Sequence, residues 1–255
     1  MYVACSTLCF ARYPLERALR IIGELEFSKV DVAIHAQGPH LRPAEVLADV
    51  GLAAQKIRIG PSLTPAAFNV EIDTPEPAEF ERQLRAVCQL ARCSTTVSVL
   101  TIPAAPAGTA LDAEIKRLAH LVRIVEAEGL LLTVETRCGT LTELPEAAVE
   151  LCQRVSGLGL TLDPSHYIVG PNQGKSFDAV YPYVRHVHLR DTGRGQEHFQ
   201  VRVGQGEIEY GRIISHLSRY NYQRLLTVEI NDIPDGPFPM EPEVRKLKYL
   251  LESLV

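Results

Sequence analysis

A repeated polar pattern ends four short β-branched runs in the second half of the sequence. Three runs end in threonine, an apolar residue and an acid, and the fourth carries a His-Val-His triplet in the same place: Thr133–Glu135, Thr161–Asp163, Thr227–Glu229 and His186–His188. Because side chains alternate across a strand, the first and last residues of each triplet share one face. The last residues should therefore lie at one depth on one polar face: Glu135, Asp163, His188 and Glu229.

Three carboxylates and an imidazole gathered in this way indicate a cation site. Buried carboxylates repel one another and lose hydration, so a neighbouring cation is needed to keep them ionised. Oxygen and nitrogen ligands suit one divalent ion, for which we expect Mn²⁺, with Mg²⁺, Co²⁺ or Zn²⁺ as alternatives. A single Thr-x-Glu at a strand end more often caps the next helix, but four such endings in succession favour a shared metal site.

The elements that must position these residues alternate between strand and helix along the whole chain. Eight runs are interpreted as strands, at 2–6, 30–34, 56–60, 96–102, 130–135, 158–163, 184–190 and 225–230. Amphipathic stretches predict helices at 14–25, 43–54, 76–93, 109–128, 143–155, 176–182, 209–219 and 241–254. Such alternation gives parallel strands joined by right-handed crossovers, and eight units close into a barrel.

We therefore predict an α/β fold, a single (β/α)8 TIM barrel, with residues 1–255 as one domain. The 255 residues match the roughly 250 that one such barrel needs. A doubly wound open sheet is the competing architecture, and it normally carries a glycine-rich turn after an early strand. The sequence after the first strand, TLCFARYP, contains no glycine.

Composition excludes several classes of protein. Hydrophobic residues make up 46% of the chain and charged residues 22%, as in ordinary globular proteins rather than disordered ones. With 26 basic and 31 acidic side chains, the net charge of −5 provides no positive field for nucleic acid. The six cysteines form no Cys-x-x-Cys pair, and no segment has the length and hydropathy of a membrane span. We expect reduced thiols, a cytoplasmic location, and neither a nucleic-acid nor a membrane partner.

With these motifs the chain resembles the xylose isomerase-like TIM-barrel superfamily, the sugar phosphate isomerases and epimerases that also include a branch of DNA-repair endonucleases. The resemblance is carried by LTVE ending at Glu135, LDPSH at 162–166, HVHLRD at 186–191, VGQGEI at 203–208 and LTVEI around Glu229. It is specific over residues 130–230, whereas the first half matches only in the rhythm of its strands and helices.

The resemblance implies a function for most of these residues. Its metal ligands would be Glu135, Asp163, His188 and Glu229, and the two glutamates would act as acid and base through a metal-stabilised enediolate. His166 of the Asp-x-x-His pattern and Arg194, six residues after His188, would bind substrate. Apart from the resemblance, Arg137 follows Glu135 by two residues and is a further candidate for substrate binding, although a loop arginine is as often a solvated surface residue. The implied activity is that of an isomerase or epimerase of carbohydrate metabolism, acting on a sugar, a sugar phosphate or a related small polyhydroxy carbonyl compound. Homo-oligomers are common in the family.

Several polar residues near the pattern have less defined roles. We expect His186 to lie one layer below His188, where it would support the metal-binding residues rather than bind the ion itself. Arg190 shares the phase of His188, whereas Asp191 does not and should orient a neighbouring group. His198 lies in the loop before VGQGEI, and His35 ends a strand, where a satisfied loop histidine is more common than a substrate contact.

Departures from the family bear on the substrate. The endonuclease branch has extra histidines after the third and fourth strands, where this chain reads PSLTPAAF and TIPAAPAG. The free ketose epimerases follow the first glutamate with Asn-Arg-Phe, and here the sequence is Thr-Arg-Cys-Gly. A dehydratase of the inosose or dehydroshikimate type is the nearest alternative function, since it begins with the same proton abstraction. An endonuclease-like barrel and a non-catalytic metal-binding barrel are the remaining alternatives.

Overall fold

Eight parallel strands form a closed barrel in the computed structural model, which describes residues 1–58, 63–94, 96–234, 236 and 238–255. Each strand pairs with the next along the chain, and β8 pairs with β1 to close the barrel. The strands are β1 (Tyr2–Ser6), β2 (Lys29–His35), β3 (Thr64–Glu71), β4 (Val99–Pro103), β5 (Leu131–Glu135), β6 (Gly159–Leu162), β7 (Val184–Leu189) and β8 (Leu225–Val228). The predicted (β/α)8 TIM barrel is confirmed.

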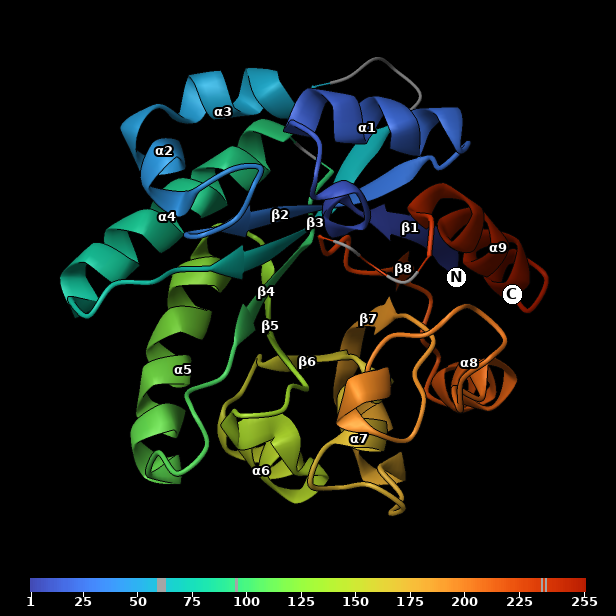
Figure 1. Cartoon of the computed structure of the whole chain (residues 1–255). Helices are drawn as coiled ribbons and strands as arrows, with labels where there is room; N and C mark the ends of the chain where they lie inside the picture. The colour runs from blue at the N-terminus through green and yellow to red at the C-terminus, as the bar shows by residue number, and fades with distance from the viewer. Residues whose placement is uncertain (59–62, 95, 235, 237) are drawn as a thin grey trace.

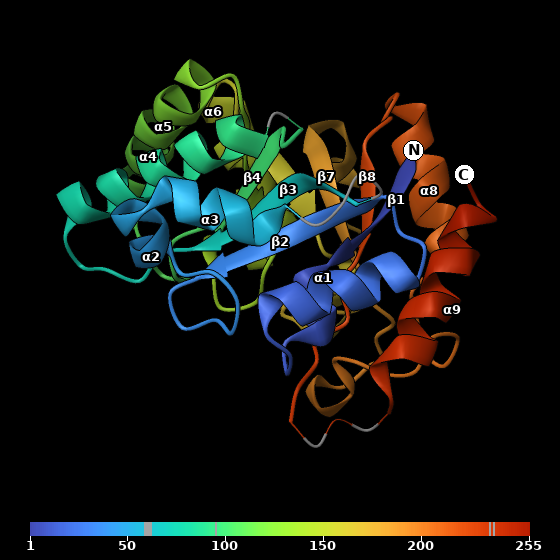
Figure 2. The ribbon, with the colours of Figure 1, turned by 90° about the horizontal axis from the view of Figure 1, so that it is seen from above.

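Helices surround the barrel and connect its strands (Figure 1). They are α1 (Leu15–Glu24), α2 (Pro43–Ala48), α3 (Val50–Ile57), α4 (Pro77–Ser94), α5 (Leu111–Ala127), α6 (Pro145–Arg154), α7 (Pro164–Val169), α8 (Tyr210–Arg219) and α9 (Met240–Glu252). Short 3-10 helices add η1 (Thr7–Phe10), η2 (Leu141–Glu143), η3 (Asp178–Tyr183) and η4 (Gln196–His198). Helix α9 packs against β1 and β8, so the two termini lie close together (Figure 2).

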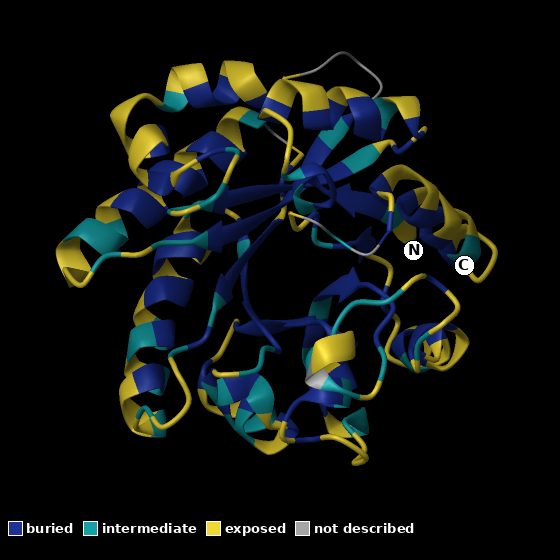
Figure 3. Cartoon of the chain, viewed as in Figure 1, coloured by how far each residue is buried: buried dark blue, intermediate teal, exposed yellow. Residues whose placement is uncertain are grey.

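Burial follows the layers of the barrel. The strands are buried almost throughout, whereas each helix buries one side and exposes the other (Figure 3). Aliphatic and aromatic side chains from the outer face of the strands, such as Phe68 and Ile34, pack in the core beneath the helices. The inner face carries polar groups at the end of the barrel where the strands finish, and burying them requires that they bond to one another.

The third strand lies further along the chain than the sequence predicted. The prediction was 56–60, but Lys56 and Ile57 end helix α3, and residues 59 and 60 fall outside the described part. Asp49 caps this helix, because its carboxylate accepts from the Leu52 amide at 2.8 Å. Strand β3 occupies 64–71 instead, between β2 and β4.

The sixth connection also differs from the prediction. Where a helix was expected at 176–182, the structure has the 3-10 helix η3, which contains Pro182. A short α-helix, α7, begins directly after β6 at Pro164, a residue whose fixed φ suits the first helical turn. Asp163 caps α7, so the helix and the predicted metal ligand are structurally linked.

Among the described residues, none of the helices combines the length and the hydropathy that crossing a membrane demands.

Candidate functional site

The carboxyl ends of the strands surround a cavity of about 290 Å³. Its lining comes from every part of the chain: Leu8, His35, Asn69, Glu71, Glu135, Arg137, His166, Arg190, Phe199, Glu229 and Asn231. This end of a TIM barrel is where active sites of the fold occur. A larger hollow of about 610 Å³ lies outside the barrel against α1 and the end of α3, and its lining includes none of the predicted site residues.

Three of the four predicted metal ligands meet at one point beneath this cavity. The Nδ1 atom of His188 lies 2.8 Å from Oε1 of Glu135 and 3.4 Å from Oε1 of Glu229. One ligand atom from each of the three residues falls within 4.8 Å of the others, and all three side chains are buried. Two carboxylate oxygens and an imidazole nitrogen form a donor set that fits a divalent ion.

The fourth predicted ligand, Asp163, lies beside this group and is bound to an arginine. Its Oδ1 accepts from the Ser165 amide at 3.0 Å and also from the Ser165 hydroxyl. Its Oδ2 accepts from Nη2 of Arg190 at 2.5 Å, and the same nitrogen lies 3.3 Å from Oε1 of Glu229. Arg190 therefore links Asp163 to the other carboxylates.

Arg190 is the buried cation of the site. Its side chain is only 2% exposed, and its guanidinium carbon lies 4.9 Å from the centroid of the Phe199 ring. The Nε and Nη1 atoms have no hydrogen-bond partner among the described residues. Arg190 lies two residues after His188 and therefore on the same inner face, as the sequence indicated, and its side chain lines the cavity.

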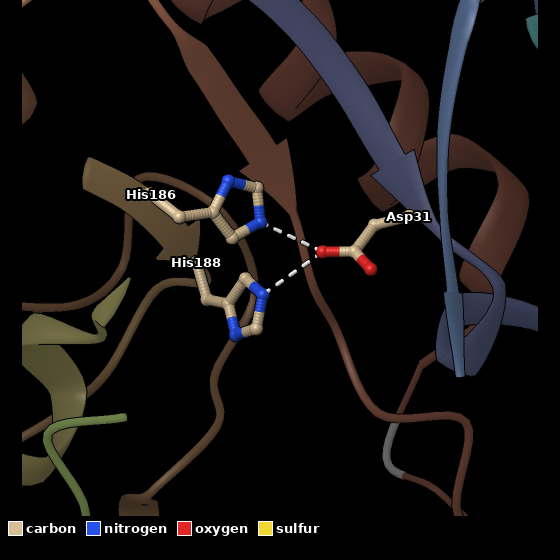
Figure 4. A group of neighbouring side chains, drawn as sticks. All are labelled: Asp31, His186 and His188. Atoms are coloured by element: carbon tan, nitrogen blue, oxygen red, sulfur yellow. Dashed lines mark hydrogen bonds and ion pairs between the residues drawn. The ribbon is translucent and has the colours of Figure 1, made fainter. Parts of the chain in front are cut away.

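Asp31 of β2 forms a second layer below Glu135, His188 and Glu229. Its Oδ2 accepts from Nε2 of His186 at 2.7 Å and from Nε2 of His188 at 3.1 Å (Figure 4). His186 thus lies one layer below His188, where the sequence predicted it, but Asp31 was missed. The available signal was an acid in the middle of the apolar run VDVAI, on the same strand face as His35.

A layer of threonine hydroxyls also lies inside the barrel. Thr101 Oγ1 is 3.1 Å from that of Thr133 and 2.8 Å from that of Thr161, and the latter two are 2.7 Å apart. The threonines of the repeated triplets at β5 and β6 therefore satisfy one another below the carboxylates that follow them.

Burial and neighbouring charges separate the proton affinities of the two glutamates. Burial alone would raise the pKa of Glu135, but the hydrogen bond to His188 and nearby positive charges lower it to about 2. Burial and repulsion from Glu135 raise the pKa of Glu229, although His188 and Arg190 oppose this change. Carboxylates whose pKa values are driven apart in one pocket are typical of an acid and base pair.

The pKa of His188, which contacts both glutamates, is shifted as well. Burial alone would lower the pKa of His188, but the three surrounding carboxylates outweigh it and raise that pKa well above its usual value. Burial likewise opposes ionisation of Asp31, and the hydrogen bonds from the two imidazoles outweigh it and lower its pKa. The site is thus a densely charged network of buried side chains.

Neutral polar groups and one ion pair form the rim of the cavity. Arg137 pairs with Glu71 and lies 4.0 Å from Oε2 of Glu135. Asn69 donates to Oε2 of Glu229 at 3.4 Å. His166 accepts at Nδ1 from the Cys138 amide at 3.2 Å, leaving its Nε2 3.8 Å from Asp163. Burial lowers the pKa of His166.

The structure does not bring Arg194 to this cavity. Its side chain is 80% exposed and pairs with Glu207 at 3.1 Å on the surface. The arginine that lines the cavity is Arg190, four positions earlier, together with Arg137. His198 is also exposed, 3.2 Å from Glu197, whereas His35 does line the cavity.

Asp191 has the orienting geometry that its outward phase indicated. Its Oδ2 accepts from the amides of Gly204 at 2.6 Å and Gly206 at 3.1 Å. A Cβ atom at position 206 would lie 2.2 Å from Oδ1 of Asp191, which accounts for glycine there. Asp191 therefore holds the VGQGEI turn against the end of β7.

The fold agrees with comparison to known proteins. The family described as xylose isomerase-like TIM barrel matches residues 19–252, and the chain belongs to this family. An uncharacterized protein of Methanocaldococcus jannaschii is 25% identical over 135 residues, which are 49% of this chain. That alignment spans 45% of the relative, slightly less than half its length.

Solved structures share the barrel at low sequence identity. D-allulose 3-epimerase from a Methylomonas species superposes with a TM-score of 0.76 at 14% identity, covering 100% of this chain and 98% of that one. The IolI protein with a bound zinc atom has a TM-score of 0.76 at 15% identity, with 100% and 98% covered. A probable 3-DHS dehydratase, AsbF of Bacillus anthracis, has a TM-score of 0.72 at 15% identity, with 99% of both chains covered. At identities this low, the superpositions show that these proteins share the fold.

Proposed function

We propose that the protein is a divalent-metal-dependent isomerase or epimerase of a small polyhydroxy carbonyl compound. The observation that carries the proposal is the convergence of Glu135 and Glu229 on one nitrogen of His188, under a cavity that both glutamates line. Membership of the xylose isomerase-like family and the likeness to an epimerase structure support it.

Glu135, His188 and Glu229 would hold the ion, with Asp163 beside them as the fourth candidate ligand. A divalent ion bound there would neutralise the carboxylates and polarise a substrate carbonyl together with its neighbouring hydroxyl. Mn²⁺ is our first choice, because carboxylate-rich sites with one imidazole suit it, and Mg²⁺, Co²⁺ and Zn²⁺ are the alternatives. All six cysteines are free thiols, which suits the reducing cytoplasm that we propose as the location.

The two glutamates would move the proton. One carboxylate takes the carbon-bound proton beside the carbonyl, and the other returns a proton to the carbon skeleton from its own side. His188 holds Oε1 of Glu135, whereas Glu229 accepts from Asn69 at Oε2 and from Arg190 at Oε1, so both carboxylates are held in place. Because they extend from β5 and β8, the two glutamates approach the cavity from different parts of the barrel.

The charges of the cavity favour a substrate without phosphate. The two arginines of its lining are already paired, Arg137 with Glu71 and Arg190 with Asp163 and Glu229. A phosphate dianion would add negative charge beside the three glutamates of the lining, Glu71, Glu135 and Glu229. Sugar hydroxyls can instead bond to neutral lining groups such as Asn69 and Asn231. We therefore propose a neutral polyhydroxy carbonyl substrate.

Hydrogen exchange tests this function directly. Protein loaded with Mn²⁺ would be incubated with a panel of ketoses in D₂O and followed by NMR. The expected result is deuterium at the carbon beside the carbonyl, together with an epimer or isomer. At saturating Mn²⁺, Glu135→Gln and Glu229→Gln should each lower turnover by about 10²–10⁴-fold, because each removes an acid–base group. The exposed Glu207→Gln is the matched control, and full turnover by Glu229→Gln would contradict the assignment.

A dehydratase is the second candidate, and the likeness to the AsbF structure is the observation that favours it. Dehydration begins with the same proton abstraction and then expels a hydroxyl as water. Incubation with cyclic polyhydroxy ketones would reveal it through a new ultraviolet absorbance from the conjugated product. Appearance of that chromophore without deuterated epimer would replace the isomerase proposal with the lyase.

A further inference from the structure

We propose that Asp31 is a positioning residue that holds the Nε2 proton and the ring orientation of His188, so that Nδ1 is the nitrogen left to bind a metal ion beside Glu135 and Glu229. The inference rests on the proposed metal-dependent function and deepens it, because Asp31 belongs to neither the acid–base pair nor the ligand set. It follows from the contacts of a single carboxylate oxygen in the interior of the barrel.

His188 contacts a carboxylate through each of its two ring nitrogens. Its Nε2 lies 3.1 Å from Oδ2 of Asp31 (Figure 4). Its Nδ1, on the other side of the ring, lies 2.8 Å from Oε1 of Glu135. An ionised carboxylate only accepts hydrogen bonds, so Nε2 must carry a proton and donate it. By the same rule Nδ1 donates to Glu135 in the metal-free site. A bound divalent ion would take the place of the Nδ1 proton, while the Nε2 proton stays on Asp31.

His186 holds Asp31 in this position from below. The Nε2 of His186 donates to the same Oδ2 at 2.7 Å, and its ring meets that of His188 edge-on with centroids 4.9 Å apart. Asp31, His186 and His188 have no exposed side-chain surface. A change of the carboxylate therefore acts directly on the imidazole ring.

The same three residues could be considered as a second metal site, but the distances favour hydrogen bonds. Both imidazoles point at one oxygen from 2.7 and 3.1 Å, which is the spacing of an N–H donor and its acceptor. An ion between these atoms would need each nitrogen to lose its proton and the three side chains to separate. A carboxylate that receives the second N–H of a ligating histidine is a recurrent support for metal sites.

Asp31→Asn tests the inference with a side chain of nearly the same shape. The amide can offer its N–H₂ group to His188 and so favour the wrong tautomer, whereas the wild-type carboxylate cannot. Titration with Co²⁺ alone, read by calorimetry and by visible absorption, should show one ion per wild-type chain. Binding to Asp31→Asn should be about 10–100-fold weaker, with an altered absorption spectrum.

Glu114→Gln is the matched control. Glu114 is also a buried acid, bonded to the Ala105 amide and to Arg117, but it lies on α5 outside the barrel. Its variant should bind Co²⁺ with wild-type affinity. Unchanged affinity and spectrum in Asp31→Asn, or two ions bound per wild-type chain, would overturn the positioning role.

A second measurement needs no variant and remains decisive if Asp31→Asn fails to fold. NMR of ¹⁵N-histidine-labelled wild-type protein with Zn²⁺ reports which nitrogen of His188 carries a proton. We expect a protonated Nε2 and a metal-bound Nδ1, and the reverse assignment would overturn the inference. A wild-type protein that binds neither Co²⁺ nor Zn²⁺ would refute the proposed function itself, whereas binding without dependence on Asp31 would refute only this inference.

Discussion

Replacement of Arg190 by methionine should destabilise the protein strongly while preserving side-chain bulk. Arg190 is 2% exposed and donates to Asp163 at 2.5 Å and to Glu229 at 3.3 Å. Its loss leaves two buried carboxylates without their cation. Removing one partner of a buried ion pair costs about 3–5 kcal/mol, because the remaining charge is neither hydrated nor compensated. For a chain of this size, that corresponds to a fall in Tm of about 6–20 °C.

The assay is urea unfolding of the metal-free protein, followed by circular dichroism. Arg194→Met provides the matched control, since this arginine is 80% exposed and pairs with Glu207 on the surface. Its effect should stay within about 1 kcal/mol. In the double variant Asp163→Asn/Arg190→Met, the loss should be smaller than the sum of the two single losses, because the unpaired carboxylate has been removed.

If Arg190→Met unfolded within about 1 kcal/mol of the wild type, the range expected of a surface ion pair, Arg190 would not be needed to neutralise the buried carboxylates. Additive losses in the double variant would show instead that Asp163 and Arg190 stabilise the fold independently.

Two further predictions concern the core and the thiols. Phe68→Ala should lower the free energy of unfolding by about 3–5 kcal/mol in urea titrations, because the ring is fully buried on β3, whereas Tyr220→Ala at the surface should change it by less than about 0.5 kcal/mol. In the native protein a thiol reagent should label the exposed Cys93 first. Burial raises the pKa values of Cys88 and Cys152 to about 12, so these two thiols should stay unlabelled when the pH is raised from 7 to 9. Rapid labelling of Cys88 or Cys152 would contradict their burial.

The barrel and most of its strands could be predicted because the apolar runs of a buried parallel sheet stand out from the amphipathic helices between them. The third strand could not. The run KIRIG has the β-branched alternation of a strand, yet its first two residues complete a helix capped by Asp49. The true strand, TPAAFNVE, begins near a proline and contains two alanines, so its place in the sheet depends on burial between β2 and β4 rather than on local propensity.

The residues of the site that follow from the alternation of side chains along a strand could be predicted from the sequence. The spacing of the triplets correctly placed Glu135, His188 and Glu229 together, since each lies on the inner face at the end of its strand. Spacing could not show that Asp163 would cap α7 and bind Arg190, because that depends on how the chain leaves β6. Asp31 was missed for a similar reason: its partners are more than 150 positions away in the sequence, on β7.

Closure of the barrel has a consequence for how the protein is made. Strand β1 obtains its second neighbour only from β8, where Tyr2 pairs with Leu225. At about 5–20 residues per second, a ribosome needs roughly 10–45 s to travel from one strand to the other. Throughout that interval the nascent chain can form at most an open sheet with unpaired edges, through which strands of other chains can add. Truncation before β8 should therefore yield an aggregating product rather than a smaller barrel.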